Sequence, residues 1–198
     1  MRTHRCGALL ALLLTGLPSG GSLAASSSSS AAADAVPVPE GYRMTDYRAP
    51  TPAALPGAVT VDTAQARALV EGGVEDGKAV AINVLKLDRS TLPGGPWIVA
   101  KPFQQIPGGV WLPNVGLGAL TPELDGYFRA NLDRLTKGRR DRGVLFYCLA
   151  DCWMSWNAAK RAMEMGYRQV YWYRDGMDGW IEAGLPTEEA KPVPVAVR

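Results

Sequence analysis

Two cysteines, Cys148 and Cys152, are the residues of this chain whose type and spacing best suit covalent chemistry. They stand four residues apart in the segment CLADCW, and an apolar run, VLFYC, leads into the first of them. A thiolate is a strong nucleophile, and a second thiol within reach can displace a group bound to the first by forming a disulfide. The spacing therefore indicates thiol chemistry, with Cys148 as the nucleophile and Cys152 as the resolving cysteine.

The N-terminus has the features of an export signal. A positively charged segment, RTHR, precedes the apolar run from Ala8 to Leu14, which is too short to span a bilayer, and small residues follow as far as Ala24. We predict a signal peptide over residues 1–24 and a periplasmic protein without a membrane span in its mature form. Cleavage removes Arg2 and Arg5 from the 21 Lys and Arg, which leaves 19 against 19 Asp and Glu. This balance argues against a nucleic-acid partner.

The remaining composition excludes most other kinds of catalytic site. The 198-residue chain has one histidine, His4, and a third cysteine, Cys6, and both lie in the predicted signal peptide. No Ser-His-Asp or Cys-His mechanism is therefore available to the mature protein. Two cysteines alone cannot complete a tetrahedral zinc site, and C-x-x-x-C-W is not the C-x-x-C-H motif of a c-type haem. We predict no metal site and no bound cofactor.

Residues 25–56 are expected to form a linker and an arm. Alanine and serine dominate the first part, which is typical of a flexible linker. Prolines at positions 37, 39, 50, 52 and 56 exclude a regular helix or a central strand from the second part. Tyr42, Met44 and Tyr47 make this part too apolar for a free tail, so we expect an extended arm that lies on the domain surface.

From residue 57 onward, short apolar strands alternate with amphipathic helices. We expect strands at 59–61, 79–85, 110–112, 144–148 and 169–173, and helices at 63–71, 122–137, 155–165 and 177–183. Thr63 and Ser155 are the expected caps of two of these helices. Residues 86–109 are expected to form a long irregular insertion. The alternation predicts an α/β fold in a single domain, with a mostly parallel sheet flanked by helices on both faces.

In such a sheet Cys148 ends a buried strand, at the edge where parallel sheets bind their ligands. The turn from Leu149 to Trp153 and the start of the next helix would direct amide groups at the sulfur, which lowers the pKa of a thiol. We predict that Leu149, Ala150, Asp151 and Trp153 are the loop residues that hold the thiolate or a sulfur substrate.

Other roles for the two cysteines remain open at this point. A permanent Cys148–Cys152 disulfide would shape the loop, although closing so short a loop gains little chain entropy. The thiols could also be idle. The alternative function is a non-catalytic accessory module that binds a partner through the loop, the arm and the neighbouring tryptophans.

The segment from Val144 to Pro186 resembles the second half of a rhodanese-like domain. VLFYC ends on the cysteine, GYRQVYWYRDG resembles the family's next strand and glycine turn, and the closing motif is matched in spacing by Gly176, Trp180, Gly184 and Pro186. Upstream, AINVL and IPGGVWLP resemble earlier elements of the family. The arm GYRMTDYRAPTP and the CLADCW loop are similar to an exported subfamily associated with PQQ-dependent alcohol catabolism. That subfamily is named for a CXXCW motif, whereas three residues separate the cysteines here.

The resemblance implies a rhodanese-like domain over residues 57–198, in which Cys148 carries sulfur as a persulfide cradled by loop amides. It implies as partner a small sulfur or thiol substrate, or a periplasmic quinoprotein, and it links the chain to PQQ by association only. Asp151 and Trp153 stand where the family has a glycine and a basic or small polar residue. A carboxylate at this position would repel thiosulfate and raise the thiol pKa, which argues against ordinary thiosulfate:cyanide sulfur transfer.

Overall fold

The computed structural model describes residues 36–71, 78–91 and 95–195. These residues fall within one unit of the chain, Asp34–Arg198. The predicted signal peptide and the Ala/Ser part of the predicted linker lie outside the described residues.

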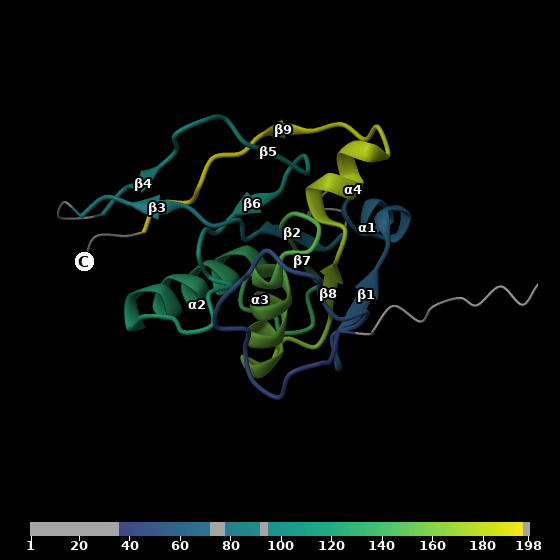
Figure 1. The fold of residues 1–198 in the computed structure, drawn as a ribbon, viewed down its shortest axis with the longest axis horizontal. Helices are drawn as coiled ribbons and strands as arrows, with labels where there is room; N and C mark the ends of the chain where they lie inside the picture. Colours follow the sequence, from purple (N-terminus) through teal and green to yellow (C-terminus); the bar gives the residue numbers. More distant parts are fainter. Residues whose placement is uncertain (1–35, 72–77, 92–94, 196–198) are drawn as a thin grey trace, which may run out of the picture. The chain divides into compact units, whose positions relative to one another are not determined.

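A five-stranded parallel sheet forms the centre of this unit, with the strand order β1-β8-β7-β2-β6 (Figure 1). The strands are β1 (Val59–Val61), β2 (Val80–Asn83), β6 (Val110–Trp111), β7 (Val144–Tyr147) and β8 (Val170–Tyr173). Every residue of β2 and β7 is buried. Strands that are covered on both faces are apolar runs rather than alternating ones, which explains why these two were visible in the sequence. β7 is the middle strand, so its C-terminal end lies at the centre of the sheet edge.

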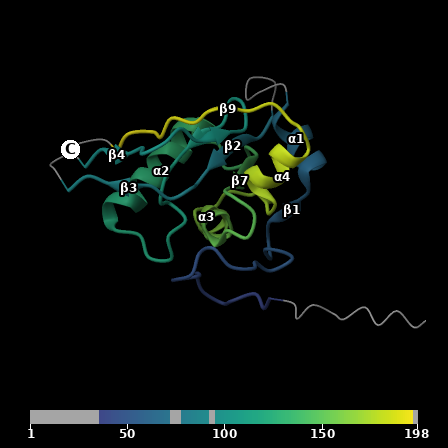
Figure 2. The ribbon, with the colours of Figure 1, turned by 45° about the horizontal axis from the view of Figure 1, so that its top comes forward.

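Helices cover both faces of the sheet (Figure 2). On one face lie α2 (Pro122–Thr136) and α3 (Trp153–Glu164), and the rings of Phe128 in α2 and Phe146 in β7 meet edge-on, 5.9 Å apart. On the other face lie α1 (Thr63–Val70) and α4 (Gly176–Glu182), and Trp180 of α4 packs against Tyr173 of β8. The predicted α/β fold, with a parallel sheet flanked by helices on both faces, is confirmed.

The cap of α1 is Asp62 rather than the predicted Thr63. The Asp62 carboxylate accepts the amide of Gln65, and the Gln65 side chain accepts the amide of Asp62, so the two residues form a capping box. Thr63 is the first helical residue, and its hydroxyl instead forms a 2.8 Å hydrogen bond with the hydroxyl of Tyr173. Asp62 is the cap because Gln65, three residues further on, has a side chain that completes the capping box.

The predicted irregular insertion, residues 86–109, contains three short strands. β3 (Asp88–Arg89) pairs with β4 (Trp97–Ile98) in a small antiparallel ribbon. β5 (Gln104–Gln105) pairs with β9 (Glu188–Glu189), close to the C-terminus. The prediction was wrong for these residues, because strands of two residues are too short to show an alternating pattern in the sequence.

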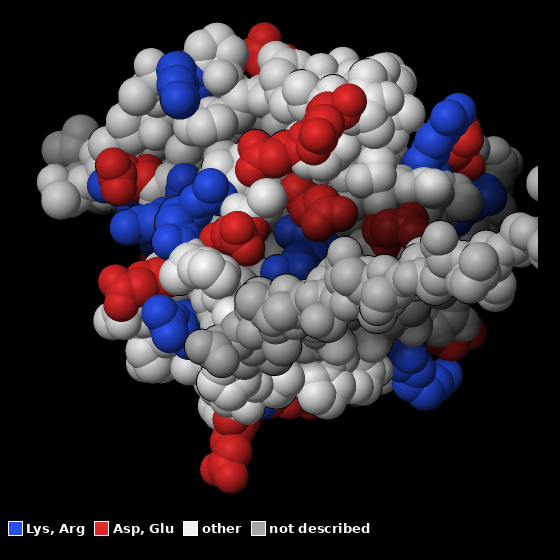
Figure 3. Space-filling model, turned by 45° about the vertical axis from the view of Figure 1, so that its right-hand side comes forward, with Lys and Arg blue, Asp and Glu red and all other residues white. Residues whose placement is uncertain are grey.

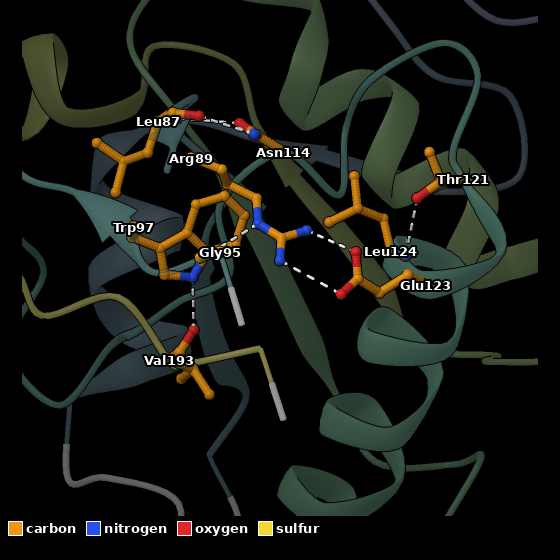
Figure 4. A network of polar contacts seen from close by, with 9 residues as sticks. All are labelled: Leu87, Arg89, Gly95, Trp97, Asn114, Thr121, Glu123, Leu124 and Val193. Atoms are coloured by element: carbon orange, nitrogen blue, oxygen red, sulfur yellow. Dashed lines mark hydrogen bonds and ion pairs between the residues drawn. The ribbon is translucent and has the colours of Figure 1, made fainter. Parts of the chain in front are cut away.

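Polar contacts fasten the ribbon to its surroundings (Figure 4). The Arg89 guanidinium donates to the carboxylate of Glu123 in α2 at 2.6 Å. The Trp97 indole donates to the carbonyl of Val193 at 2.8 Å. These bonds hold the insertion against α2 and against the C-terminal segment.

Candidate functional site

Cys148 lies directly after the central strand, β7. Only 1 % of its surface is exposed, and the four strand residues before it are fully buried. Its carbonyl accepts the amide of Met177 in α4 at 2.9 Å. The sequence places the cysteine here for a simple reason: the buried apolar strand must end before the chain can turn toward the next helix.

The turn after Cys148 depends on a left-handed residue and on a carboxylate from α4. Asp151 has a φ of +47°, a conformation that aspartate tolerates better than most residues. Its exposed carboxylate lies 4.0 Å from the guanidinium of Arg174. The amide of Ala150 donates to the carboxylate of Asp178 at 2.8 Å. The turn is therefore tied to α4, and one of its amides is already occupied.

Cys152 lies immediately before α3. It occupies the N-cap position and is 3 % exposed, and the helix starts at Trp153 rather than after the predicted cap, Ser155. Ser155 is instead a buried residue of the first turn, whose hydroxyl donates to the carbonyl of Cys152 at 3.1 Å. The same hydroxyl accepts the indole N–H of Trp172 in β8 at 3.0 Å. This tertiary partner holds Ser155 inside the helix, so it was wrong to expect it as the cap.

The two cysteines are buried free thiols, and each changes the pKa of the other. Burial raises the pKa of the Cys148 thiol well above its ordinary value, and its hydrogen bond to Cys152 raises it further. The same hydrogen bond lowers the pKa of Cys152 to about 7. The amides of Met154, in the first turn of α3, and of Leu149 also stabilise the Cys152 thiolate, electrostatically rather than through a short capping bond.

The sequence led us to expect a depressed pKa at Cys148. In the structure the pKa of Cys152 is lowered, whereas burial raises the pKa of Cys148. The physical reason is position, since Cys152 stands at the helix N-terminus while Cys148 is enclosed by strand, turn and α4. Whichever sulfur reacts first, the pair shares one proton and acts as a unit.

The arm of residues 36–56 lies across this pair and across α3. Arg48 faces Cys152 in an isolated antiparallel bridge. The amide of Trp153 donates to the carbonyl of Tyr47 at 2.9 Å, and the amide of Ala49 donates to the carbonyl of Asp151 at 3.1 Å. The Arg48 guanidinium donates to the carbonyl of Ala150 at 2.7 Å. The arm thus pairs with the cysteine turn as a short extra strand.

A buried asparagine in α3 holds the arm upstream of these contacts. The Asn157 amide donates to the carbonyl of Arg43 at 2.8 Å, and its side-chain oxygen accepts the Arg43 amide at 3.0 Å. The Tyr47 hydroxyl accepts the amide of Gly118 at 2.9 Å. At the downstream end, Arg174 donates to the hydroxyl of Thr51 at 3.0 Å.

The structure brings the predicted loop residues together, with differences in their roles. The Leu149 amide lowers the pKa of both thiols. The amides of Ala150 and Trp153 have other acceptors, namely Asp178 and the arm. Trp153 belongs to α3 rather than to the loop, is 2 % exposed, and donates its indole N–H to the carbonyl of Pro50 at 3.1 Å.

Sequence reasoning missed two side chains of this site. Arg48 was not singled out, since nothing local distinguishes it from the other arginines of the arm. Asp178 was not singled out either, although it is the acceptor for the Ala150 amide. The signal in the sequence was that Asp178 follows Gly176 by two residues, which places its carboxylate in the first turn of α4.

An open cavity of about 380 Å³ lies beside the turn. Its lining includes Ala150 and three acidic residues, Asp175, Asp178 and Glu182. Figure 3 brings the side of α1 and α4 forward and shows acidic side chains on this face, with basic ones among them. A doubly charged anion would be repelled here, whereas a neutral or cationic group would not.

Among the described residues, no three His, Cys, Asp or Glu side chains converge as metal ligands. No helix within the described part of the chain is both long enough and apolar enough to cross a membrane.

Residues 102–183, which hold both cysteines and all of α2, α3 and α4, match the family model described as "Rhodanese-like domain". Over these residues the chain is similar to a rhodanese-like domain. Its matched residues run from the insertion to the end of α4 and leave out the arm. The rhodanese-like α/β fold expected from the sequence is confirmed.

Solved structures with a similar fold include a thiosulfate sulfurtransferase from Pseudomonas aeruginosa, at 17 % identity and a TM-score of 0.45 over 68 % of this chain and 21 % of that one. A polysulfide-sulfur transferase homodimer from Wolinella succinogenes is 17 % identical, with a TM-score of 0.43 over 69 % of this chain and 82 % of that one. The rhodanese-like domain of an Anabaena protein is 19 % identical, with a TM-score of 0.40 over 65 % and 77 % of the two chains. This chain spans about a fifth of the Pseudomonas protein. No curated protein matches it.

Proposed function

We propose that this rhodanese-like protein accepts sulfane sulfur on its cysteine pair and completes the transfer as a Cys148–Cys152 disulfide. The observation that carries the proposal is the pair of buried free thiols at the end of the central strand, with Cys152 at the N-cap of α3. A thiolate is the form that attacks a sulfane sulfur, and a partner thiol in contact with it can resolve the product.

Each step of the proposed reaction balances. The Cys152 thiolate attacks the outer sulfur of a persulfide donor, R–S–SH; the donor's S–S bond breaks, R–S⁻ leaves, and Cys152 holds a persulfide. The Cys148 sulfur then attacks the inner sulfur of that persulfide, and the outer sulfur leaves with the Cys148 proton as hydrogen sulfide. Two electrons pass from the dithiol to the sulfane sulfur, and two equivalents of a small thiol reduce the disulfide afterwards. The order of attack is the reverse of the one expected from the sequence.

The donor class follows from the charges and amides around the turn. Asp178 accepts the Ala150 amide, and the arm accepts the Trp153 amide, so these two groups do not point at an incoming anion. The carboxylates of Asp175 and Glu182 line the cavity beside the turn, and the carboxylate of Asp151 is exposed in the turn itself. These features favour a small persulfide or polysulfide over the doubly charged thiosulfate.

Mass spectrometry of the reduced protein after reaction with glutathione persulfide tests this proposal. The wild type should end about 2 mass units lighter than its dithiol form, as a disulfide. Cys148→Ser should accumulate an adduct of about 32 mass units on Cys152. Cys152→Ser should react at least about tenfold more slowly at pH 7, because the Cys148 thiol stays protonated. An adduct that forms first on Cys148 would refute the proposed order, and a folded wild type that takes up no sulfur would refute the function.

A non-catalytic binding role is the second candidate, and the coverage of the site supports it. The arm and Trp153 leave the two cysteines with 1 % and 3 % of their surfaces exposed, as in a packed core. In this role the loop, the arm and the tryptophans would bind a periplasmic quinoprotein, in the PQQ-dependent alcohol catabolism that the sequence resemblance suggests. A Cys148→Ser/Cys152→Ser variant that restores growth on alcohol to a deletion strain would favour it over catalysis.

Export to the periplasm is part of the same proposal and rests on residues 1–24. The intact mass of the protein recovered from the periplasm tests it. A mature chain that begins within a few residues after Ala24 is expected, and retention of the full-length chain in the cytoplasm would overturn it.

A further inference from the structure

The arm places one positive side chain at the cysteine turn from outside the matched rhodanese-like residues. Arg48 lies opposite Cys152, between two main-chain hydrogen bonds of 2.9 Å and 3.1 Å that fix the arm to the turn. Its guanidinium reaches over the turn and donates to the carbonyl of Ala150 at 2.7 Å. Within the turn itself, the charged residue is Asp151, so the local sequence contributes a negative charge.

Arg48 acts electrostatically on the sulfurs. Its positive charge lowers the pKa of both Cys148 and Cys152, in opposition to burial. The effect on Cys152 adds to that of the amides at the start of α3. Arg48, on the arm, therefore stabilises the thiolate form of Cys148 and Cys152, which lie about a hundred residues further along the chain.

We infer that Arg48 is a positioning residue that the arm contributes to the reaction, because its charge stabilises the thiolate form of the cysteine pair. The inference rests on the proposed function in one respect, because it concerns the reactivity of the same sulfurs. Arg48 does not touch the substrate in this scheme. It acts through the thiolate and through the carbonyl of Ala150.

Several other charged or titratable groups face the turn and set the background against which Arg48 acts. α4 and the residue before it contribute Asp178 and Asp175, and the residue after β8 contributes Arg174. The Tyr147 hydroxyl lies on the strand side, and its pKa is raised chiefly by burial. The arm adds Tyr47 beside Arg48. The variants below leave all of these groups in place except the one changed.

The charge of Arg48 can be removed without undocking the arm. The two hydrogen bonds on either side of Arg48 use main-chain atoms of Tyr47 and Ala49, so Arg48→Gln keeps them. Arg48→Lys keeps the charge. Tyr47→Phe does the opposite of Arg48→Gln, because it removes the hydroxyl bonds to Gly118 and Met44 that fasten the arm but retains the cation.

The test is the rate of iodoacetamide alkylation of Cys152 against pH, resolved by peptide mass, in the full-length reduced protein. Arg48→Gln should slow alkylation at pH 7 roughly three- to tenfold and leave the rate at pH 10 unchanged, because it lowers only the thiolate fraction. Arg48→Lys should restore most of the rate. The matched control is Arg174→Gln, which removes another cation beside the turn; Arg174 contacts Thr51 and, at 4.0 Å, the carboxylate of Asp151, but not Ala150. In Arg174→Gln the alkylation rate of Cys152 should depend on pH as it does in the wild type.

Three results would overturn the inference. The first is an unchanged pH profile in Arg48→Gln. The second is an equal shift in Arg174→Gln, which would mean that any nearby cation has the same effect. The third is faster alkylation of Cys152 at every pH in Arg48→Gln, which would mean that Arg48 only limits access to the thiol. Sulfur uptake is measured separately in the same samples: if the wild type takes up none while Arg48→Gln still shifts the profile, the proposed function fails and the role of Arg48 stands.

Discussion

Gly176 and Cys148 are in such close contact that a β-carbon on Gly176 would lie 2.4 Å from the carbonyl oxygen of Cys148. The same glycine has a φ of +54°, a conformation that side-chain-bearing residues rarely adopt. The contact allows the amide of Met177 to reach that carbonyl at 2.9 Å. The start of α4 therefore sets the position of the cysteine turn.

Gly176→Ala is expected to lower the free energy of unfolding by about 2–4 kcal/mol, because backbone strain and overpacking act together. Urea unfolding of the reduced protein measures the loss. Gly184→Ala is the matched control, since Gly184 has a φ of +67° and a β-carbon added there would meet no neighbouring atom within 4 Å. It should lose only about 1–2 kcal/mol, from the conformation alone. Equal losses at the two positions would contradict the role given to the contact.

The left-handed conformation of Asp151 predicts a difference between two substitutions. Asp151→Gly relieves the strain of a φ of +47°, whereas Asp151→Ala keeps it, and both remove the same carboxylate and its 4.0 Å ion pair with Arg174. The glycine variant should therefore be more stable than the alanine variant by about 1–2 kcal/mol in urea unfolding. If the two unfold at the same urea concentration, the turn does not hold this residue in the left-handed region.

The bond from Ala150 to Asp178 predicts how firmly the turn is held. Asp178→Ala leaves the Ala150 amide without its acceptor at 2.8 Å and should lower stability by about 1–2 kcal/mol. Hydrogen exchange of the Ala150 amide should speed up clearly in this variant. Asp175→Ala removes a carboxylate of the same cavity that makes no capping hydrogen bond, and it should leave this amide protected. Equal exchange in the two variants would show that charge, not the bond, protects the turn.

The pKa of Cys152 predicts how the stability of the reduced protein depends on pH. Its folded-state pKa, about 7, lies below its ordinary value of 9.0. The folded protein therefore releases this proton first, and the resulting stabilisation is present above pH 9 and lost as the pH falls through 7. Urea unfolding in a phosphine reductant should show the free energy of unfolding rising between pH 7 and pH 9. The raised pKa of Cys148 acts in the opposite direction, above pH 9.

Cys152→Ser is the control for this pH dependence. Serine does not titrate in this range, so the rise between pH 7 and pH 9 should disappear. A rise that persists in Cys152→Ser would assign the titration to another group and would contradict the placement of the thiolate on Cys152.

The strands and helices around the site were predictable because their signals are local. VLFY is apolar at every position because β7 is covered on both faces, and the period of α2 is visible because one face of the helix packs on the sheet. A cysteine after such a strand is placed at the sheet edge by topology alone. The pairing of β5 with β9 was not predictable, because each strand has two residues and the partners lie more than eighty residues apart.

The sequence by itself determined the α/β fold, the location of Cys148 at the end of a buried strand, and a second cysteine close enough to react with it. These follow from hydrophobic periodicity and from chain length, both of which act between near neighbours. Only the tertiary structure decided which thiol has the depressed pKa, which loop amides are occupied, and that Arg48 lies over the turn. Those properties depend on burial and on charges brought from distant segments, and electrostatic effects of this kind are set by distance in space rather than by separation along the chain.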